Sequence, residues 1–213
     1  MSKTSLSALM GKNARLIPVL HVENPDHAVP LAEALVGAGV MALEVTLRSE
    51  AGPEVIARMR KAVPQAIVGA GTVTKPDQLA MVRDAGALFA VSPALTERLA
   101  TASEKIDIPL VPGAVTPSEM LAAREFGFHE LKFFPADLMG GTGMIKHVLP
   151  LYPDIRFCPT GGISDGNIMS YLELPNIFAV GGAWLAPRDA IEAADWKGIA
   201  ERAKKSVAVA TKG

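Results

Sequence analysis

A single lysine interrupts an apolar run in the second half of the chain. Lys132 lies in HELKFFPAD (residues 129–137), whose aliphatic and aromatic residues are typical of a buried strand. Burial disfavours the charged form of an amine, and a free amine can attack a carbonyl carbon to form an imine. The alternative is that Lys132 extends along the protein surface and keeps its ammonium group in solvent.

A glutamate is the second candidate for chemistry. In MALEVTLRS (41–49), Glu44, Thr46 and Arg48 alternate with Leu43, Val45 and Leu47. Side chains of a strand alternate between its two faces, so we expect the apolar set to meet helices and the polar set to point inward. An inward carboxylate beside an amine can transfer the protons that imine chemistry requires. A purely structural ion pair between Glu44 and Arg48 is the alternative.

The elements that must position these residues alternate along the chain. Short apolar runs predict eight strands, at 15–22, 40–47, 66–70, 87–92, 108–113, 130–134, 155–160 and 177–182. Helical periodicity separates them, as at 25–39, 75–87 and 116–127, and a last amphipathic helix with a frayed end is expected over 195–213. This alternation predicts an α/β fold, the (β/α)8 TIM barrel, as a single domain over residues 1–213. An open doubly wound sheet is the rival, but no G-x-G-x-x-G follows the first strand.

Residue types at the predicted helix ends agree with this alternation. Thr116, Pro117 and Glu119 match an N-cap, a first-turn proline and a capping-box partner. Three glycines are expected to end helices before the next strand: Gly39, Gly86 and Gly127.

The barrel predicts where the chemical groups meet. Active sites of such barrels lie at the carboxyl ends of the strands, and inward residues of even-numbered strands share layers of the lumen. Glu44 on the second strand and Lys132 on the sixth are therefore expected to face each other. The turns PTGGIS (159–164) and VGGAW (180–184) follow strands seven and eight, where barrels often bind phosphate through backbone N–H groups. Thr72 and Pro93 end strands three and four.

Composition favours a small-molecule partner. The 213 residues are 49% hydrophobic and carry a net charge of -1, which leaves no basic surplus for nucleic acid or anionic lipid. Without a signal-peptide core or an apolar run of roughly 20 residues for a membrane span, a cytosolic protein is expected. Cys158, the single cysteine, is expected in the core. The four histidines lack metal-ligand spacing and no G-x-S-x-G occurs, so a metal-free reaction is expected.

Five segments carry a family resemblance over nearly the whole chain, namely VMALEVTLRS, VGAGTV, FAVSPALTE, LKFFPAD and RFCPTGGIS, in this order. The sequence resembles the 2-keto-3-deoxy-6-phosphogluconate (KDPG) aldolases, which are grouped with the 4-hydroxy-2-oxoglutarate (KHG) aldolases. This resemblance implies that Lys132 forms a Schiff base and that Glu44 is the acid/base. The substrate-binding residues it implies are Arg48 and Thr72 for the carboxylate, Pro93 and Phe134 for the pocket wall, and Gly161, Gly162 and Gly182 for phosphate. Thr160 is a further substrate-binding candidate, because its placement affects the choice among related substrates.

One position departs from the family pattern. Many relatives have a serine where this chain has Ala183, so the hydroxyl that reaches the phosphate is missing and the backbone N–H remains. The resemblance further implies cleavage of phosphorylated 2-keto acids to pyruvate, no cofactor, and a homotrimer. Two other functions use the same features: a phosphosugar isomerase or synthase needs the glycine turns without an imine lysine, and a non-catalytic phosphate-binding barrel tolerates Lys132→Met.

Overall fold

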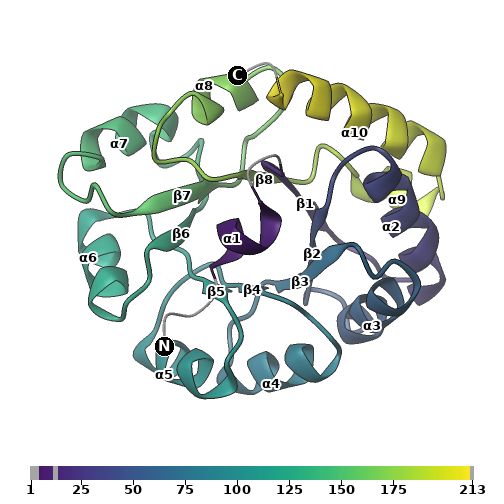
Figure 1. Cartoon of the computed structure of the whole chain (residues 1–213), viewed down its shortest axis with the longest axis horizontal. Helices are drawn as coiled ribbons and strands as arrows, with labels where there is room; N and C mark the ends of the chain where they lie inside the picture. The colour runs from purple at the N-terminus through teal and green to yellow at the C-terminus, as the bar shows by residue number, and fades with distance from the viewer. Residues whose placement is uncertain (1–4, 12–13, 212–213) are drawn as a thin grey trace.

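Eight strands form a ring surrounded by helices in the computed structural model, which describes residues 5–11 and 14–211 (Figure 1). The expected domain range of 1–213 and the last helix expected over 195–213 therefore include residues that lie outside the described ranges. Each predicted run overlaps one strand, but the strands have only two to five residues, because the ends of the runs bend into the connecting turns. The strands are β1 (Leu16–Leu20), β2 (Ala42–Thr46), β3 (Ile67–Gly71), β4 (Ala90–Val91), β5 (Leu110–Val111), β6 (Glu130–Phe133), β7 (Arg156–Pro159) and β8 (Val180–Gly182).

Parallel pairing closes the ring. Six strands pair in the order β5-β4-β3-β2-β1-β8, and β6 pairs with β7. A bridge between Gly113 and Lys132 joins β5 to β6, and a bridge between Thr160 and Gly181 joins β7 to β8. The barrel prediction is confirmed. The open doubly wound sheet is wrong, because an open sheet has two unpaired edge strands, whereas these pairings and bridges close the ring.

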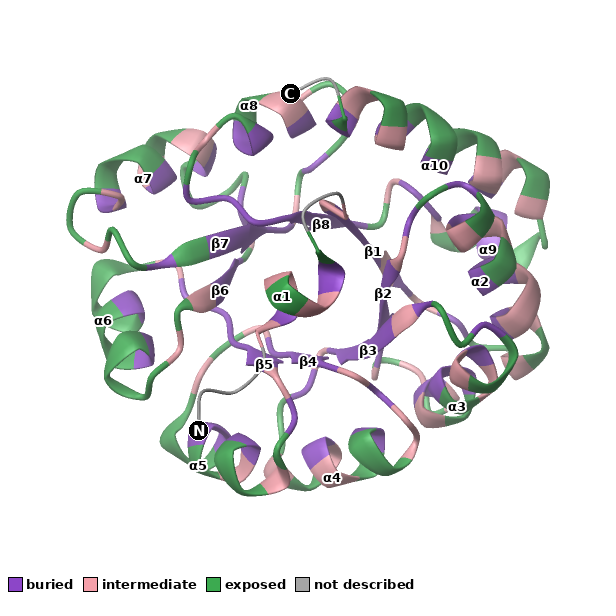
Figure 2. Cartoon of the chain, viewed as in Figure 1, coloured by how far each residue is buried: buried purple, intermediate pink, exposed green. Residues whose placement is uncertain are grey.

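The helices cover the outside of the ring and bury one face each (Figure 2). Thr116 and Glu119 form the predicted capping box, and Gly39, Gly86 and Gly127 have the expected positive φ angles. No helix among the described residues is both long and apolar enough to cross a membrane. The helical elements after the first strand are η1 (Pro25–His27), α2 (Ala28–Gly37), α3 (Gly52–Ala62), α4 (Pro76–Asp84), α5 (Glu97–Ile106), α6 (Pro117–Glu125), α7 (Gly141–Val148), α8 (Ile168–Leu172), α9 (Arg188–Glu192) and α10 (Trp196–Ala210).

A short helix that the sequence analysis missed, α1 (Leu6–Met10), lies across the amino-terminal end of the barrel (Figure 1). Leu6 and Met10 are buried and join Phe89 and Phe178 in the core that fills the lower lumen. With this end filled by apolar side chains, the polar groups of the lumen lie toward the carboxyl ends of the strands.

Candidate active site

The two residues expected to carry the chemistry are in contact. Lys132 Nζ lies 3.0 Å from Glu44 Oε1, and the two residues are 7% and 3% exposed. Both earlier alternatives are wrong: Lys132 does not reach the surface, and Glu44 pairs with Lys132 rather than Arg48. The Arg48 side chain is exposed, and no ion pair of it lies within the described ranges.

A glycine on the neighbouring strand makes room for the carboxylate. Gly71 ends β3, and a Cβ atom at this position would collide with the carboxyl group of Glu44. The sequence analysis did not single out this glycine, although the small residues of VGAG (68–71) are a signal of close approach inside a strand. Thr46, the next inward residue of β2, donates its hydroxyl to the Leu20 carbonyl at 3.0 Å. It therefore ties β2 to β1.

The expected pocket residues lie at the carboxyl ends of successive strands. Thr72 follows β3 with a φ of 60°, a left-handed conformation that is rare for a β-branched residue and typical of constrained functional sites. Pro93 follows β4 and is half-buried. Phe134 follows β6, is 38% exposed, and places its ring centre 5.4 Å from Lys132 Nζ, within cation–π range.

The end of β7 carries two small polar groups beside the lysine strand. Thr160 is buried, and its hydroxyl lies 2.6 Å from where a Cβ atom of Gly181 would be, so β8 needs a glycine there. Cys158 pairs in register with Lys132 and is buried. Burial, with a smaller contribution from the Glu44 carboxylate, raises the pKa of the Cys158 thiol to about 12. The expectation of a core cysteine is confirmed.

The two glycine turns are adjacent and present free hydrogen-bond donors. Gly161 and Gly162 have φ angles of 96° and 79°, which favour glycine. No acceptor for the backbone N–H groups of Gly162, Ala183 or Trp184 is found in the part of the chain that the structure describes. The bridge between Thr160 and Gly181 brings these turns together. Such convergent N–H groups form a site suited to an anion.

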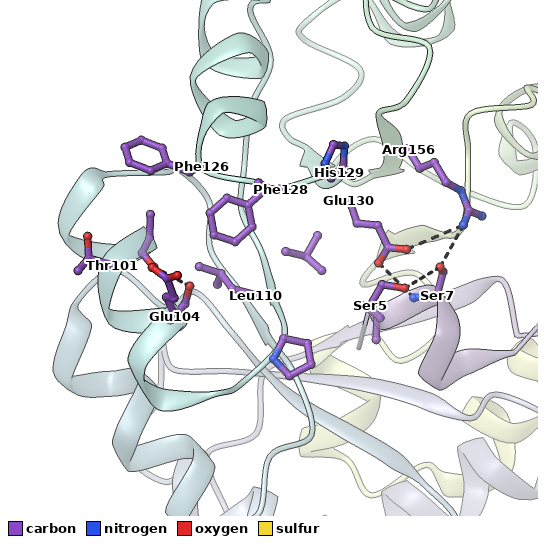
Figure 3. Close-up of a pocket in the computed structure, with 16 residues that line it drawn as sticks. Ser5, Ser7, Thr101, Glu104, Leu110, Phe126, Phe128, His129, Glu130 and Arg156 are labelled. Carbon is purple, nitrogen blue, oxygen red and sulfur yellow. Dashed lines mark hydrogen bonds and ion pairs between the residues drawn. The ribbon is translucent and has the colours of Figure 1, made fainter. Parts of the chain in front are cut away.

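A separate cavity lies elsewhere in the described structure. It has a volume of about 630 Å³ and opens near α1, α5 and the amino-terminal ends of β5 and β6 (Figure 3). Ser7 donates its backbone N–H to Glu130 at 3.1 Å at the polar end of this cavity, and Leu110 and Phe128 line its apolar part. None of the residues expected in the active site lines it. Across the described ranges, no group of three or more His, Cys, Asp or Glu residues is arranged to hold a metal ion.

Comparison with known proteins identifies the family. The family model for KDPG and KHG aldolases matches residues 8–202. The chain belongs to this aldolase family. It is 51% identical to the 2-dehydro-3-deoxy-phosphogluconate aldolase of Pseudoalteromonas atlantica, over 91% of this chain and 90% of that protein. It is 46% identical to the KHG/KDPG aldolase of Escherichia coli, over 96% of each chain. The resemblance seen in the sequence is confirmed.

Two solved structures of family members agree closely with the fold. The KDPG aldolase of Legionella pneumophila, which holds pyruvate as a covalent carbinolamine intermediate, is 40% identical with a TM-score of 0.89, over 93% of this chain and 96% of that one. The KDPG aldolase of Zymomonas mobilis ZM4 with 3-phosphoglycerate is 37% identical with a TM-score of 0.91, over 97% of each chain. Family members of this architecture therefore bind pyruvate covalently and have been seen with a phosphorylated acid.

Proposed function

We propose that the chain is a class I aldolase that cleaves KDPG to pyruvate and glyceraldehyde 3-phosphate, and also cleaves 4-hydroxy-2-oxoglutarate to pyruvate and glyoxylate. The observation that carries this proposal is the buried contact of 3.0 Å between the Lys132 amine and the Glu44 carboxylate. The names of the relatives and the pyruvate carbinolamine of the Legionella enzyme support it.

In the proposed mechanism, the free amine of Lys132 attacks the C2 ketone of the substrate, and Glu44 moves the protons needed to form the carbinolamine and expel water. The resulting iminium cation at C2 withdraws electrons from the neighbouring C3–C4 bond. Glu44, or water held by it, takes the proton of the C4 hydroxyl as the C3–C4 bond breaks, and the aldehyde leaves. The bond electrons remain on C3 as an enamine. Protonation of C3 and attack by water then release pyruvate and restore the Lys132 amine.

We assign substrate-binding roles from the arrangement around this pair. Arg48 is exposed at the mouth and is free to meet the substrate carboxylate together with Thr72. Pro93 and Phe134 form the pocket wall, and Thr160 is within the buried floor beside Cys158.

The phosphate group is assigned to the turns of Gly161, Gly162 and Gly182. Ala183 is exposed and has no hydroxyl, so only its backbone N–H can donate a hydrogen bond to the phosphate at that position. The complex of the Zymomonas relative with 3-phosphoglycerate supports a site for a phosphorylated acid.

Reductive trapping tests the imine. Incubation with pyruvate and borohydride is expected to add one reduced pyruvate to Lys132, because borohydride reduces an imine to a stable secondary amine. Peptide mass spectrometry locates the adduct. The Lys146→Met variant, which changes an exposed lysine of α7, is the matched control and is expected to be labelled like the unaltered protein. Absence of labelling at Lys132 contradicts the aldolase proposal and favours a phosphosugar isomerase or a phosphate-binding barrel.

We also propose that residues 1–213 form one domain, and that the protein works in the cytosol as a homotrimer. Leu138 is 82% exposed beside the partly exposed Met139, which leaves apolar surface available for a subunit contact. A similar chain, 27% identical, is part of a cage designed by fusing symmetric oligomeric domains. Sedimentation equilibrium is expected to give three times the chain mass of 22.4 kDa. A mass of one chain at micromolar concentration contradicts the trimer.

A further inference from the structure

The turn that follows β7 is held by the side chain of Asn167. Asn167 accepts the backbone N–H of Ser164 at 2.9 Å and donates its amide to the Gly162 carbonyl at 2.8 Å. Gly161 and Gly162 are the most permissive residues of this turn, and permissive residues lose the most freedom when they are ordered. Both polar atoms of the Asn167 side chain are thus used to fix the turn.

The turn that follows β8 is held by an aromatic side chain. The Trp184 ring lies against Gly182, where an added Cβ atom would be 2.5 Å from the ring. The indole N–H of Trp184 donates to Asp165 at 3.1 Å and to the hydroxyl of Ser206 at 3.2 Å. Asp165 belongs to the segment after β7 and Ser206 to α10. Trp184 therefore connects both turns to the last helix.

Asp165 stays ionised in this network. Partial burial acts to raise the pKa of its carboxyl group, but hydrogen bonds from Ser206, Lys205 and Trp184 together lower that pKa. Ser206 is fully buried and donates its hydroxyl to Asp165 Oδ1. A carboxylate that accepts hydrogen bonds from donors on two segments, one buried and one half-buried, holds those segments in one arrangement.

We propose that Asn167, Trp184 and Asp165 are positioning residues that hold the two glycine turns as one preformed cradle for the substrate phosphate. The inference rests on the proposed function, because it assigns the unpaired N–H groups of Gly162, Ala183 and Trp184 to that phosphate. Donors that are already in place bind an anion without a further ordering cost. This is especially important in a chain whose Ala183 supplies no hydroxyl.

Two variants test the inference by separating phosphate recognition from chemistry. Asn167→Ala removes both turn contacts, and Trp184→Phe keeps a ring against Gly182 while it removes the N–H donor. Each variant is assayed with KDPG, with its unphosphorylated analogue 2-keto-3-deoxygluconate, and with inorganic phosphate as a competitive inhibitor. Lys204→Gln is the control, because Lys204 is an exposed residue of α10 close to the network in sequence, and no hydrogen bond or ion pair of its side chain is found within the described residues.

Both variants are expected to raise the KM for KDPG and the inhibition constant of phosphate by about tenfold, the size of one lost charge-assisted contact, with kcat changed less than about twofold. The kcat/KM for 2-keto-3-deoxygluconate and the pyruvate trapping at Lys132 are expected to stay the same, as are all values for Lys204→Gln.

Equal losses on both sugars, or an unchanged KM for KDPG in both variants, would overturn the positioning role while leaving the aldolase intact. If the unaltered enzyme shows no preference for KDPG and phosphate does not inhibit it, the phosphate assignment fails and this inference fails with it. The trapping experiment then still reports separately on the imine chemistry.

Discussion

The Lys132→Met variant is expected to cleave KDPG with a kcat at least about 10⁴-fold lower than that of the unaltered enzyme, since no other group replaces the covalent intermediate. Cleavage of the C3–C4 bond leaves an electron pair on C3, and only the iminium cation formed by Lys132 can accept it. Methionine has a similar length and keeps the lumen filled, so the barrel is expected to fold. Pyruvate release, measured with a coupled dehydrogenase, gives the rate.

The Lys132→Met variant leaves the Glu44 carboxylate without its partner. Glu44 is 3% exposed and loses its only cationic neighbour within hydrogen-bond distance in the described structure. The double variant Lys132→Met, Glu44→Gln removes this charge and is expected to be as inactive as the single variant, while thermal unfolding reports whether its fold is kept. Activity within tenfold of the unaltered enzyme in a folded Lys132→Met protein would contradict the imine mechanism.

The Glu44→Gln variant is expected to lower kcat by roughly 10²- to 10⁴-fold, the usual contribution of a positioned acid/base. An amide has nearly the same shape as a carboxylate and can still accept a hydrogen bond from the Lys132 amine, but it cannot carry protons. The lysine therefore keeps its place while dehydration and C3–C4 cleavage slow. Single-turnover trapping with pyruvate and borohydride is expected to show a slower approach to full labelling at Lys132, with the same final extent.

A matched control for this substitution is Glu50→Gln, because Glu50 is an exposed residue in the loop after β2. It is expected to leave kcat and the rate of trapping unchanged. If Glu44→Gln retained full kcat, the carboxylate would have only a structural role beside Lys132, and the protons would have to come from another group.

Much of the site was predictable from local patterns. The alternation in MALEVTLRS assigned Glu44 to the inner face of β2, and the apolar run around Lys132 indicated a buried lysine. Their meeting followed from the fold, since inward residues on even strands of a barrel share layers. The strand order also followed from the alternation of strands and helices, which restricts a parallel sheet to a few topologies.

Other features were not predicted from the sequence. The helix α1 is five residues long, and its burial depends on the open lower end of the barrel, which exists only once the ring has closed. Gly71 is needed because the Glu44 side chain crosses toward β3.

The hydrogen bonds among Asp165, Trp184 and Ser206 join the segments after β7 and β8 to α10, and these three residues are distant in sequence. Nothing in the sequence alone shows which donor meets which acceptor across such distances.

The sequence by itself determined the period of each element, the order of the elements, and the residue types available for imine chemistry, because these depend on neighbours along the chain. Tertiary structure alone decided that Glu44 pairs with Lys132 and not with Arg48. It also decided that the two glycine turns lie side by side. These outcomes depend on distances of a few ångströms between strands that are far apart in sequence, and such distances are fixed only when the barrel packs.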